Sequence, residues 1–371
     1  MPVFPKYSHT YNFQDFLIAI SGIFLDYSSK LKKELKKILK KDYNIYFLDS
    51  GRSALNIILK DLNLPKGSEV AIPANICEVV VETILRNDLK PLLIDITDNL
   101  TICPNDLKKK ITHNTKVIIP VHAFGNLYDI EEIQNIAKAN GCIVIEDSAQ
   151  TFTSKYNGKN VGIFGDYAFF SLDVTKHISA FGGGVLVTKK PIKIKTKQEL
   201  GIKKILELIA FKFLTNKIIY TFLTKNIIPQ IKSISYYPPR NKKLSKIGIA
   251  LAYSQIKKIE EINNVRKENV RKIIALIEDK LKIYSQNKNR APSYTVLPLG
   301  VKKKIKIEKY LEKIIDLPKP VPLLTRLKKY ETYWNDCPNA EIIQNQLILL
   351  PTYIKVNRNI EKIIKNIKHI N

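Results

Sequence analysis

Short, almost continuously apolar runs alternate with amphipathic segments through the first half of the chain. The apolar runs lie at residues 44–49, 70–74, 91–96, 116–124, 142–147, 167–172 and 183–188. Segments with an apolar residue at every third or fourth position separate several of them, at 78–87, 105–111 and 130–141. Apolar strands that alternate with helices are typical of a mostly parallel sheet covered by helices on both faces. The pattern therefore predicts an α/β fold.

The two ends of this α/β region have a different character. Two helical stretches are expected near the amino terminus, an apolar one at 13–25 and a basic amphipathic one at 28–41. Residues 190–235 are basic and apolar with little alternation, and 246–281 have the period of one long amphipathic helix. Three strand-like pieces and a closing helix follow, at 294–301, 319–324, 345–353 and 360–370.

These changes of pattern divide the chain into three parts. We predict a helical segment over residues 1–44, a large domain over 45–235 that includes the 190–235 insert, and a smaller α+β domain over 236–371. A length of 371 residues, with 45% hydrophobic and 26% charged residues, is ordinary for a folded protein of about two domains.

The cysteines and the termini bear on the cellular compartment. Cys77, Cys103, Cys142 and Cys337 lie far apart without a C-x-x-C spacing, which excludes a zinc ribbon and a disulfide scaffold and favours a reducing compartment. The first residues lack the pattern of a secretory signal, and charges interrupt the apolar stretch 205–228 too often for a membrane span. We expect a cytoplasmic protein.

The formal net charge of +27 has two interpretations. A basic surface attracts nucleic acid, but no helix-turn-helix, zinc-finger or aromatic RNA-binding signature accompanies it, so we do not expect a nucleic-acid partner. The apolar stretches 13–25 and 190–235 carry flanking lysines and fit helices that lie in a membrane interface. Internal packing or a dimer contact would give the same stripes, so peripheral contact with the inner membrane face stays an open expectation.

An acidic residue and a lysine stand where strands end. Asp147 closes the run 142–147, and Lys176 follows 29 residues later, ahead of the glycine run 182–184. Such a pair suits pyridoxal phosphate, since a lysine amine can bond the aldehyde and a carboxylate can keep the ring nitrogen protonated. By itself the pair is weak support, because an isolated lysine is usually a solvated cation.

The sequence SGRSAL, residues 50–55, joins the first apolar run to a helical pattern. A turn of small residues at a helix start presents backbone N–H groups and the positive end of the helix dipole, which suits a phosphate. The other interpretation is an ordinary helix cap made by Ser50, with Arg52 facing solvent. Both interpretations remain open from these residues alone.

Taken together, these motifs resemble the DegT family of pyridoxal-phosphate-dependent nucleotide-sugar aminotransferases. The likeness runs from about residue 45 to the end, interrupted at 190–235, and rests on the order and spacing of several segments. They are SGRSAL, VAIPANICE with PLLIDI, VIIPVHAFGNLYDIEEI, EDSAQ, FGDYAFFSLDVTKHISAFGGGVLVT and NAEIIQNQLILLPTY. The resemblance implies the fold type I of PLP-dependent transferases, with a mostly parallel seven-stranded sheet in the large domain and a smaller α+β domain.

The resemblance also assigns roles. Lys176 falls at the Schiff-base lysine, Asp147 at the pyridinium partner and Gln150 at the glutamine near the phenolic oxygen of the cofactor. Phosphate contacts are implied for Gly51, Arg52, Ser53 and Ser171. Asn241 aligns with an asparagine that reaches the cofactor phosphate of the neighbouring subunit, which implies a homodimer.

Three segments depart from the family pattern. Arg52 and Ser53 replace the usual threonine and alanine of the phosphate turn, and Lys243 with Leu244 replaces an arginine–methionine pair after Asn241. Cys77 stands where an aromatic residue or histidine usually stacks on the cofactor ring, and it is either a stacking residue or a small buried hydrophobe. His177 is expected to shape the site next to Lys176.

The implied activity is transfer of an amino group from a donor, by resemblance L-glutamate, to a keto-sugar attached to a nucleotide, for surface glycan or polysaccharide biosynthesis. Two alternatives remain. Some members of the family are sugar dehydratases with histidine in place of the lysine, and Lys176 argues against that branch. A non-catalytic protein that uses this scaffold to bind a membrane surface or nucleic acid is the other.

Overall fold

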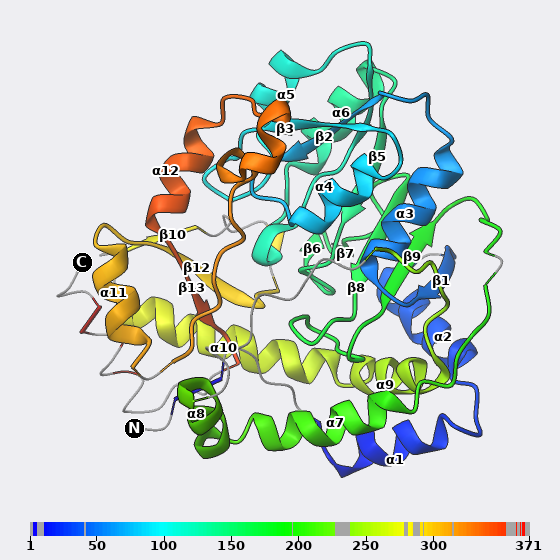
Figure 1. Cartoon of the computed structure of the whole chain (residues 1–371), viewed down its shortest axis with the longest axis vertical. Helices are drawn as coiled ribbons and strands as arrows, with labels where there is room; N and C mark the ends of the chain where they lie inside the picture. The colour runs from blue at the N-terminus through cyan, green and yellow to red at the C-terminus, as the bar shows by residue number, and fades with distance from the viewer. Residues whose placement is uncertain are drawn as a thin grey trace.

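The computed structural model describes most of the chain, namely residues 3–5, 11–40, 42–194, 196–226, 238–277, 281–284, 290–291, 293–313, 315–353, 361, 364, 366 and 367. A seven-stranded sheet lies at its centre, with helices on both faces and a second, smaller sheet beside it (Figure 1). Residues 227–235 of the 190–235 insert and most of the closing helix expected at 360–370 fall outside the described residues.

The central sheet has the order β1-β9-β8-β5-β4-β2-β3. Its strands are β1 (Asn44–Leu48), β2 (Glu69–Pro73), β3 (Lys90–Ile94), β4 (Thr115–Ile118), β5 (Ile143–Asp147), β8 (Tyr167–Ser171) and β9 (Gly184–Thr188). Strands β3, β2, β4, β5 and β8 pair in parallel, and β9 pairs antiparallel with both β8 and β1. The seven apolar runs and the mostly parallel seven-stranded sheet are therefore confirmed.

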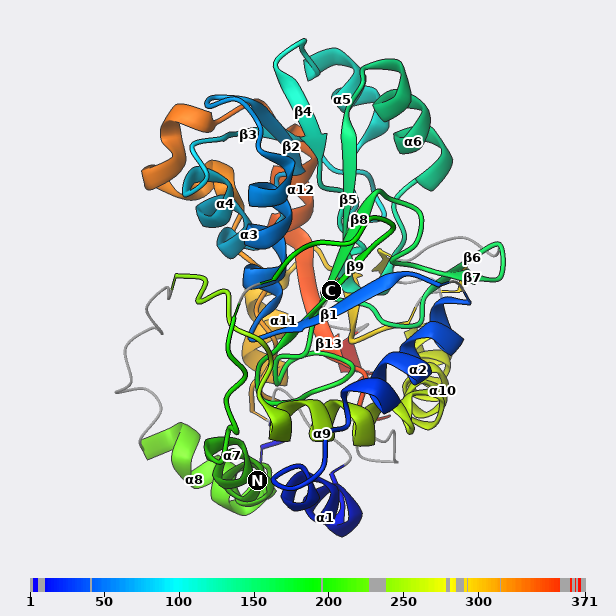
Figure 2. The same cartoon turned by 90° about the vertical axis from the view of Figure 1, so that its right-hand side faces the viewer.

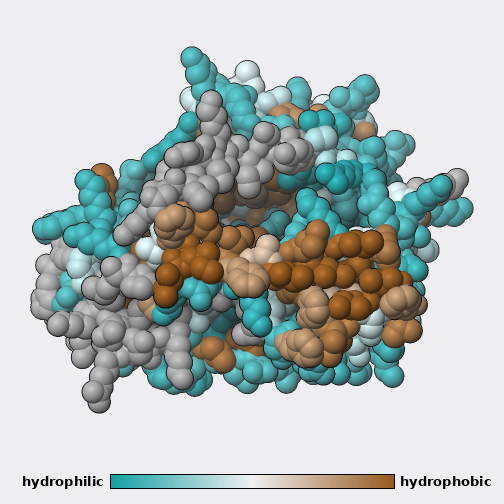
Figure 3. Space-filling view, turned by 60° about the horizontal axis from the view of Figure 1, so that its bottom comes forward, coloured by the Kyte–Doolittle hydropathy of each residue, from teal (hydrophilic) through white to brown (hydrophobic). Residues whose placement is uncertain are grey.

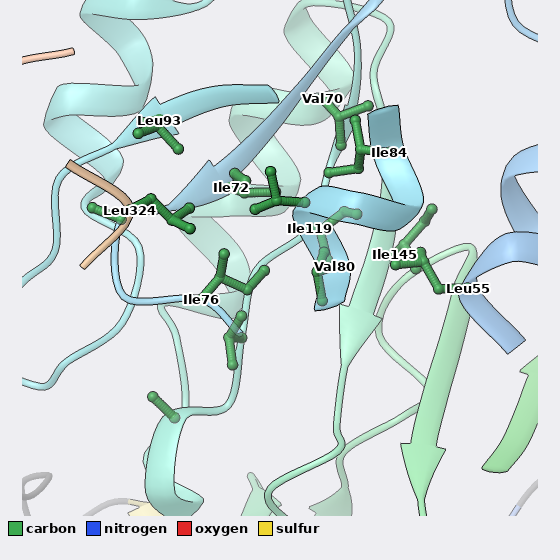
Figure 4. Close-up of a cluster of buried hydrophobic side chains, with 14 of the residues drawn as sticks. Leu55, Val70, Ile72, Ile76, Val80, Ile84, Leu93, Ile119, Ile145 and Leu324 are labelled. Atoms are coloured by element: carbon green, nitrogen blue, oxygen red, sulfur yellow. The ribbon is translucent and has the colours of Figure 1, made fainter. Parts of the chain in front are cut away.

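Alternation along the strands gives each face of the sheet its own core. Val70 and Ile72 on β2 pack with helices α3 (Gly51–Leu62) and α4 (Glu78–Leu85), whereas Ala71 packs with α5 (Pro104–Lys110) and α6 (Ile130–Ala139). Figure 4 shows side chains of the first cluster, in which Ile72, Ile76 and Leu324 lie close together. Because Leu324 belongs to the carboxy-terminal part, the two parts of the chain share this core.

The amino-terminal helices α1 (Phe13–Ser21) and α2 (Ser28–Leu39) pack on α9 (Lys246–Ile256). Helix α7 (Lys203–Leu214) lies beside α1 at one end of the molecule, and α8 (Lys217–Asn226) follows on the other side of α7 (Figure 2). Within the described ranges, no helix is long and apolar enough to cross a membrane.

The long helix expected over 246–281 is two helices, α9 and α10 (Ile259–Ile277), so that prediction is wrong in its continuity. The two halves have different surroundings: α9 is buried on nearly all sides, whereas α10 buries one face only. At the junction Lys258 extends its ammonium 2.7 Å from the buried carboxylate of Asp15 on α1. The junction thus coincides with a buried ion pair that ties it to the amino-terminal helix.

The carboxy-terminal part contains a three-stranded antiparallel sheet with α11 (Lys304–Leu311) and α12 (Pro338–Gln346). Its strands are β10 (Lys282–Ile283), β12 (Val296–Gly300) and β13 (Leu347–Pro351). The strand expected at 319–324 is absent from these described residues, because Pro318, Pro320 and Pro322 lack the N–H groups a ladder needs. A third sheet consists of β6 (Lys155–Tyr156), β7 (Lys159–Asn160) and β11 (Arg290–Ala291).

Asp95, one residue beyond β3, fastens α12 to the large sheet. Its carboxylate is buried and accepts hydrogen bonds from the backbone N–H groups of Ile96 (2.8 Å), Asn339 (3.0 Å) and Ala340 (2.8 Å). The last two belong to the first turn of α12, so the carboxylate also meets the positive end of that helix dipole. Asp95 is thus a structural link between the two parts of the chain.

We expect Asp95→Ala to lower the free energy of unfolding by about 2–4 kcal/mol, because two buried N–H groups and one partly buried N–H group lose a charged acceptor. Urea denaturation followed by circular dichroism measures the loss. Asp98→Ala is the matched control, since Asp98 is exposed and only pairs with Lys282 at the surface. Equal effects of the two substitutions would contradict the role of Asp95.

Candidate active site

Asp147 ends β5 at the carboxyl edge of the sheet, where open α/β sheets bind their ligands. Its side chain is buried, and one oxygen accepts a hydrogen bond of 2.9 Å from the N–H of Ala149. Burial raises the pKa of Asp147 to about 6, while the nearby charges of Lys176 and His122 act in the opposite direction. The carboxylate is thus poorly compensated by the protein and suited to a cationic partner.

Lys176 lies in the loop that joins β8 to β9. Its charge acts directly on Asp147, so the two residues lie near each other although 29 positions separate them in the sequence. The side chain is half-buried, and its own backbone N–H donates to Asp173 (3.0 Å) within a tight turn. The fold therefore brings together the acid and the amine that the sequence singled out.

The neighbouring acid, Glu146, has a different role. It is fully buried, and its oxygens accept from the backbone N–H groups of Gly162 (3.0 Å), Phe164 (2.5 Å) and Gly165 (2.7 Å). His122 lies 3.1 Å from the same carboxylate. Glu146 is saturated by the protein and holds a loop in place, whereas Asp147 keeps acceptor capacity for a ligand.

The turn at residues 50–53 opens α3 close to the ends of β8 and β9. Ser50 caps the helix by accepting from the N–H of Ser53 (3.1 Å), as one interpretation of the sequence expected. The same turn packs against Ser171, since a Cβ built on Gly51 would lie 3.5 Å from the Ser171 Cβ. The first N–H groups of a helix have no acceptor within it, so capping by Ser50 and phosphate binding are compatible.

Gly184, the last residue of the glycine run, lets β9 pass close to this turn. A Cβ at this position would meet the Ser50 carbonyl oxygen at 2.3 Å and the Gly51 nitrogen at 2.5 Å. The close approach explains why the chain needs glycine here.

Gly184→Ala is expected to push the turn at residues 50–53 away from β9. We expect the free energy of unfolding to fall by about 1–3 kcal/mol and cofactor binding to weaken. Thermal unfolding and cofactor titration measure the two effects. Gly158→Asn provides the control, because a Cβ there meets nothing within 4 Å and asparagine tolerates the positive φ of 73°. Normal cofactor affinity in Gly184→Ala would contradict the proposed packing.

A basic pocket adjoins the phosphate turn. Ser50 and Arg52 form one wall, and the cationic residues around it are Lys203, Lys204, Arg240, Lys242 and Lys243. Carboxylates of Asp49, Glu199 and Glu207 also line it, and Lys242 pairs with Glu199. The excess of cations suits an anionic ligand that carries phosphate groups.

Asn241 lies beside this turn in the same chain. Its backbone N–H donates to the Ser53 hydroxyl (3.2 Å), and its side-chain oxygen accepts from Asn56 (2.9 Å). The role that the resemblance implied for Asn241, contact with the phosphate of a neighbouring subunit, stays a prediction; within its own chain Asn241 contacts the turn at residues 50–53. The backbone at Asn241 has a positive φ of 55°, which asparagine adopts more readily than most residues.

The remaining predicted residues lie at the same edge of the sheet. Gln150 follows β5 in the loop, and its side-chain oxygen accepts from the N–H of Phe124 (2.7 Å). Cys77 directly precedes α4 and is exposed, so the interpretation as a buried small hydrophobe is wrong. His177, next to Lys176, is buried.

Two residues that the sequence analysis missed hold the loop of Lys176. The ammonium of Lys204 on α7 donates to the carbonyl oxygens of Ala180 (2.6 Å), Phe181 (2.7 Å) and Gly182 (3.1 Å). Burial lowers the pKa of Lys204 to about 8. The Tyr11 hydroxyl donates to Ser179 (2.9 Å). No sequence signal distinguishes Lys204 from the many surface lysines, because its partners are backbone carbonyls.

This arrangement fits pyridoxal 5′-phosphate on three grounds. The under-compensated Asp147 matches a protonated ring nitrogen, Lys176 supplies the amine, and the turn at 50–53 with Ser171 offers phosphate donors. No group of three or more His, Cys, Asp or Glu among the described residues is arranged to hold a metal ion.

Comparison with curated proteins gives partial matches. The chain is 36% identical over 165 residues to the pleiotropic regulatory protein of Geobacillus stearothermophilus and 38% identical over 143 residues to GDP-perosamine synthase of Escherichia coli O157:H7. These alignments cover 44% and 38% of this chain and 44% and 39% of the relatives, so the chain spans less than half the length of the curated relatives it matches.

Solved structures match over almost the whole length. GDP-4-keto-6-deoxy-D-mannose-3-dehydratase of E. coli with bound hydrated PLP gives a TM-score of 0.78 at 21% identity, covering 100% of this chain and 99% of the other. A Helicobacter pylori aminotransferase involved in pseudoaminic acid biosynthesis gives 0.79 at 18% identity, covering 99% and 98%. The fold is thus the one expected from the sequence. The sequence profile of the DegT/DnrJ/EryC1/StrS aminotransferase family matches residues 21–368, and the chain belongs to this family.

Proposed function

We propose that this protein is a pyridoxal 5′-phosphate-dependent aminotransferase that moves an amino group from L-glutamate to a nucleotide-linked keto-sugar. The observation that carries the proposal is the proximity of Lys176 to the buried Asp147 at the carboxyl edge of the sheet. Family membership over residues 21–368 supports the same chemistry.

Each residue of the site has a task in this reaction. When bound, pyridoxal 5′-phosphate supplies an aldehyde that accepts the amino group and a ring that withdraws electrons. Lys176 would hold the cofactor through its amine, and as a free amine it would move a proton to or from the substrate carbon. Asp147 would keep the ring nitrogen protonated, and the N–H groups of Gly51 and Arg52, which Ser50 does not cap, would hold the phosphate.

The acceptor class is argued from the basic pocket and from the relatives. A nucleotide-linked sugar carries a diphosphate, and Arg52, Lys242 and Lys243 line a pocket next to the phosphate turn. The relatives include GDP-perosamine synthase and, at 34% identity, a UDP-N-acetyl-3-dehydro-alpha-D-glucosamine 3-aminotransferase of Acidithiobacillus ferrooxidans. Surface glycan or polysaccharide biosynthesis is the corresponding role.

Dehydration of the keto-sugar is the second candidate. It is favoured by the fold shared with a 3-dehydratase and by the buried His177 beside Lys176. Lys176 itself favours amino transfer, because the dehydratases that the sequence resembles carry histidine at the lysine position.

A half-reaction assay separates the two candidates. The enzyme, first treated with L-glutamate, is mixed with GDP- and UDP-linked 4-keto- and 3-keto-sugars while the cofactor absorbance is followed. Amino transfer predicts that a keto-sugar restores the original spectrum and becomes an amino sugar of matching mass. Loss of water from the sugar without gain of nitrogen would overturn the proposal.

We further propose a homodimer in the cytoplasm. The family resemblance supports the dimer, and the widely spaced cysteines support a reducing compartment. Analytical ultracentrifugation of the holoenzyme tests the dimer, and a monomer at micromolar concentration would contradict it.

A further inference from the structure

A broad apolar face lies at the end of the molecule formed by α1, α7 and α8. We call it the apolar face and define it by its exposed residues, which are Phe13, Leu17, Phe24, Leu25, Ile202, Leu206, Ile209, Phe213, Leu214, Ile218, Ile219 and Phe222. Figure 3 shows these hydrophobic side chains gathered across this face. Soluble monomers rarely expose so many large apolar side chains together, so the face is expected to meet a partner.

The pattern of α7 turns a hydrophobic stripe outward. Residues Ile202, Leu206, Ile209 and Phe213 follow the helical period and share one side of the helix, with exposed fractions of 58%, 64%, 40% and 63%. The inward side is held independently, because Leu208 is buried in the core and Phe211 packs edge-on against Tyr11 and Phe181. The stripe is therefore additional to what the fold needs.

Cations border this stripe. By the same period, Lys203 and Lys212 lie on opposite sides of it, and Lys217 begins α8. Of the acids nearby, Glu207 pairs with Lys203 and Asp15 on α1 is buried against Lys258, whereas Asp26, next to Leu25, is exposed. The apolar face thus combines large hydrophobic side chains with a net positive border.

We propose that the apolar face docks on the surface of an anionic lipid bilayer, with α1, α7 and α8 lying in its interface. Helices that bury aromatic and aliphatic side chains among the acyl chains and present lysines to the headgroups bind such surfaces. A second copy seated on the same face would bring lysines against lysines, so charge favours lipid over self-association.

The docking face is connected to the loop of Lys176. Lys204 on α7 and Tyr11 next to α1 hold the backbone of residues 179–182 through four hydrogen bonds. Docking therefore places the loop that carries Lys176 directly behind the lipid-facing helices.

Vesicle co-sedimentation of the full-length holoenzyme tests the proposal. Vesicles of phosphatidylcholine alone are compared with equimolar phosphatidylcholine and phosphatidylglycerol, each at low and high salt. We expect binding to the anionic vesicles that weakens at high salt, and much weaker binding to the neutral vesicles. Because it uses the wild-type protein, this comparison does not depend on any variant folding.

Two double variants divide the apolar and charged contributions. Leu206→Ser with Phe213→Ser is expected to lower partition onto anionic vesicles at least about tenfold. Lys212→Glu with Lys217→Glu should lower partition roughly 30-fold on anionic vesicles and little on neutral ones.

Matched controls at the opposite end of the molecule are Ile342→Ser on α12, where Ile342 is 57% exposed, and Lys109→Glu with Lys138→Glu on α5 and α6. Both controls should bind vesicles like the wild type.

Three results would overturn the proposal. They are no sedimentation with anionic vesicles at low salt, equal losses in the control and test variants, or a protein that keeps its vesicle binding but changes from dimer to monomer when Leu206 and Phe213 are replaced. The last result would assign the apolar face to a second copy of the chain.

Discussion

Replacing Lys176 with alanine is expected to lower kcat by at least about 10³-fold and to abolish covalent attachment of pyridoxal 5′-phosphate. Lys176 lies in the loop after β8, near enough for its charge to lower the pKa of Asp147, and we propose that its amine both bonds the cofactor and moves the substrate proton. A methyl group can do neither. Steady-state kinetics with glutamate and a keto-sugar nucleotide, together with the visible absorbance of the holoenzyme, measure the two losses.

Two further substitutions give this prediction its controls. Lys176→Arg keeps the positive charge near Asp147 but cannot bond the aldehyde, so it should be as inactive as alanine. Lys159→Ala removes an exposed lysine of β7 and should leave kcat unchanged. Retention of more than about a tenth of the wild-type kcat in Lys176→Ala would exclude the assigned role.

Asp147→Asn is expected to reduce kcat by at least about 10²-fold and at the same time to stabilise the cofactor-free protein. Catalysis suffers because asparagine cannot keep the ring nitrogen protonated. Stability improves because the buried carboxylate has a pKa of about 6 instead of 3.8. At about 1.36 kcal/mol for each pKa unit, the free energy of unfolding of Asp147→Asn should exceed that of the wild type by up to about 3 kcal/mol at neutral pH.

The stabilisation by Asp147→Asn should change with pH in a definite direction. Because the folded protein holds the Asp147 proton more tightly than the unfolded chain, the cost of ionising it is complete above a pH of about 6 and vanishes below 3.8. The stabilisation by Asp147→Asn should therefore be largest at pH 7 to 8 and shrink as the pH is lowered toward 5. Urea denaturation of the two cofactor-free proteins measures it. A variant less stable than wild type at pH 8, or a difference independent of pH, would contradict the account.

The sequence predicted the central sheet because its strands are buried on both faces. The run 70–74 is entirely apolar, and 142–145 is apolar up to the acids Glu146 and Asp147, so the burial of these strands follows from their composition. The prediction of a strand at 319–324 was wrong. Its hydrophobic residues alternate with prolines, which have no N–H group to donate to a neighbouring strand. The continuity of 246–281 was also wrong, and the junction near Lys258 coincides with an ion pair to Asp15, which lies more than two hundred residues away in the sequence.

The candidate site was predictable where chemistry lies at strand ends. Asp147 closes an apolar run and Lys176 follows one, and the edge of a parallel sheet collects such residues, but the resemblance to the family was needed to choose them among the other acids and lysines. Lys204, Glu146 and the Asp95 anchor could not be assigned their roles, because these roles depend on backbone groups that only the folded chain brings near. The contact of Asn241 with its own phosphate turn likewise required the fold.

The most direct test of the central claim is to map the lysine that carries the cofactor. The holoenzyme is reduced with borohydride, digested, and its peptides are identified by mass spectrometry. A cofactor-sized mass increase on the peptide containing Lys176 is the predicted result. Attachment to a different lysine, or no covalent addition in a protein shown to bind pyridoxal 5′-phosphate, would contradict the pairing of this amine with Asp147.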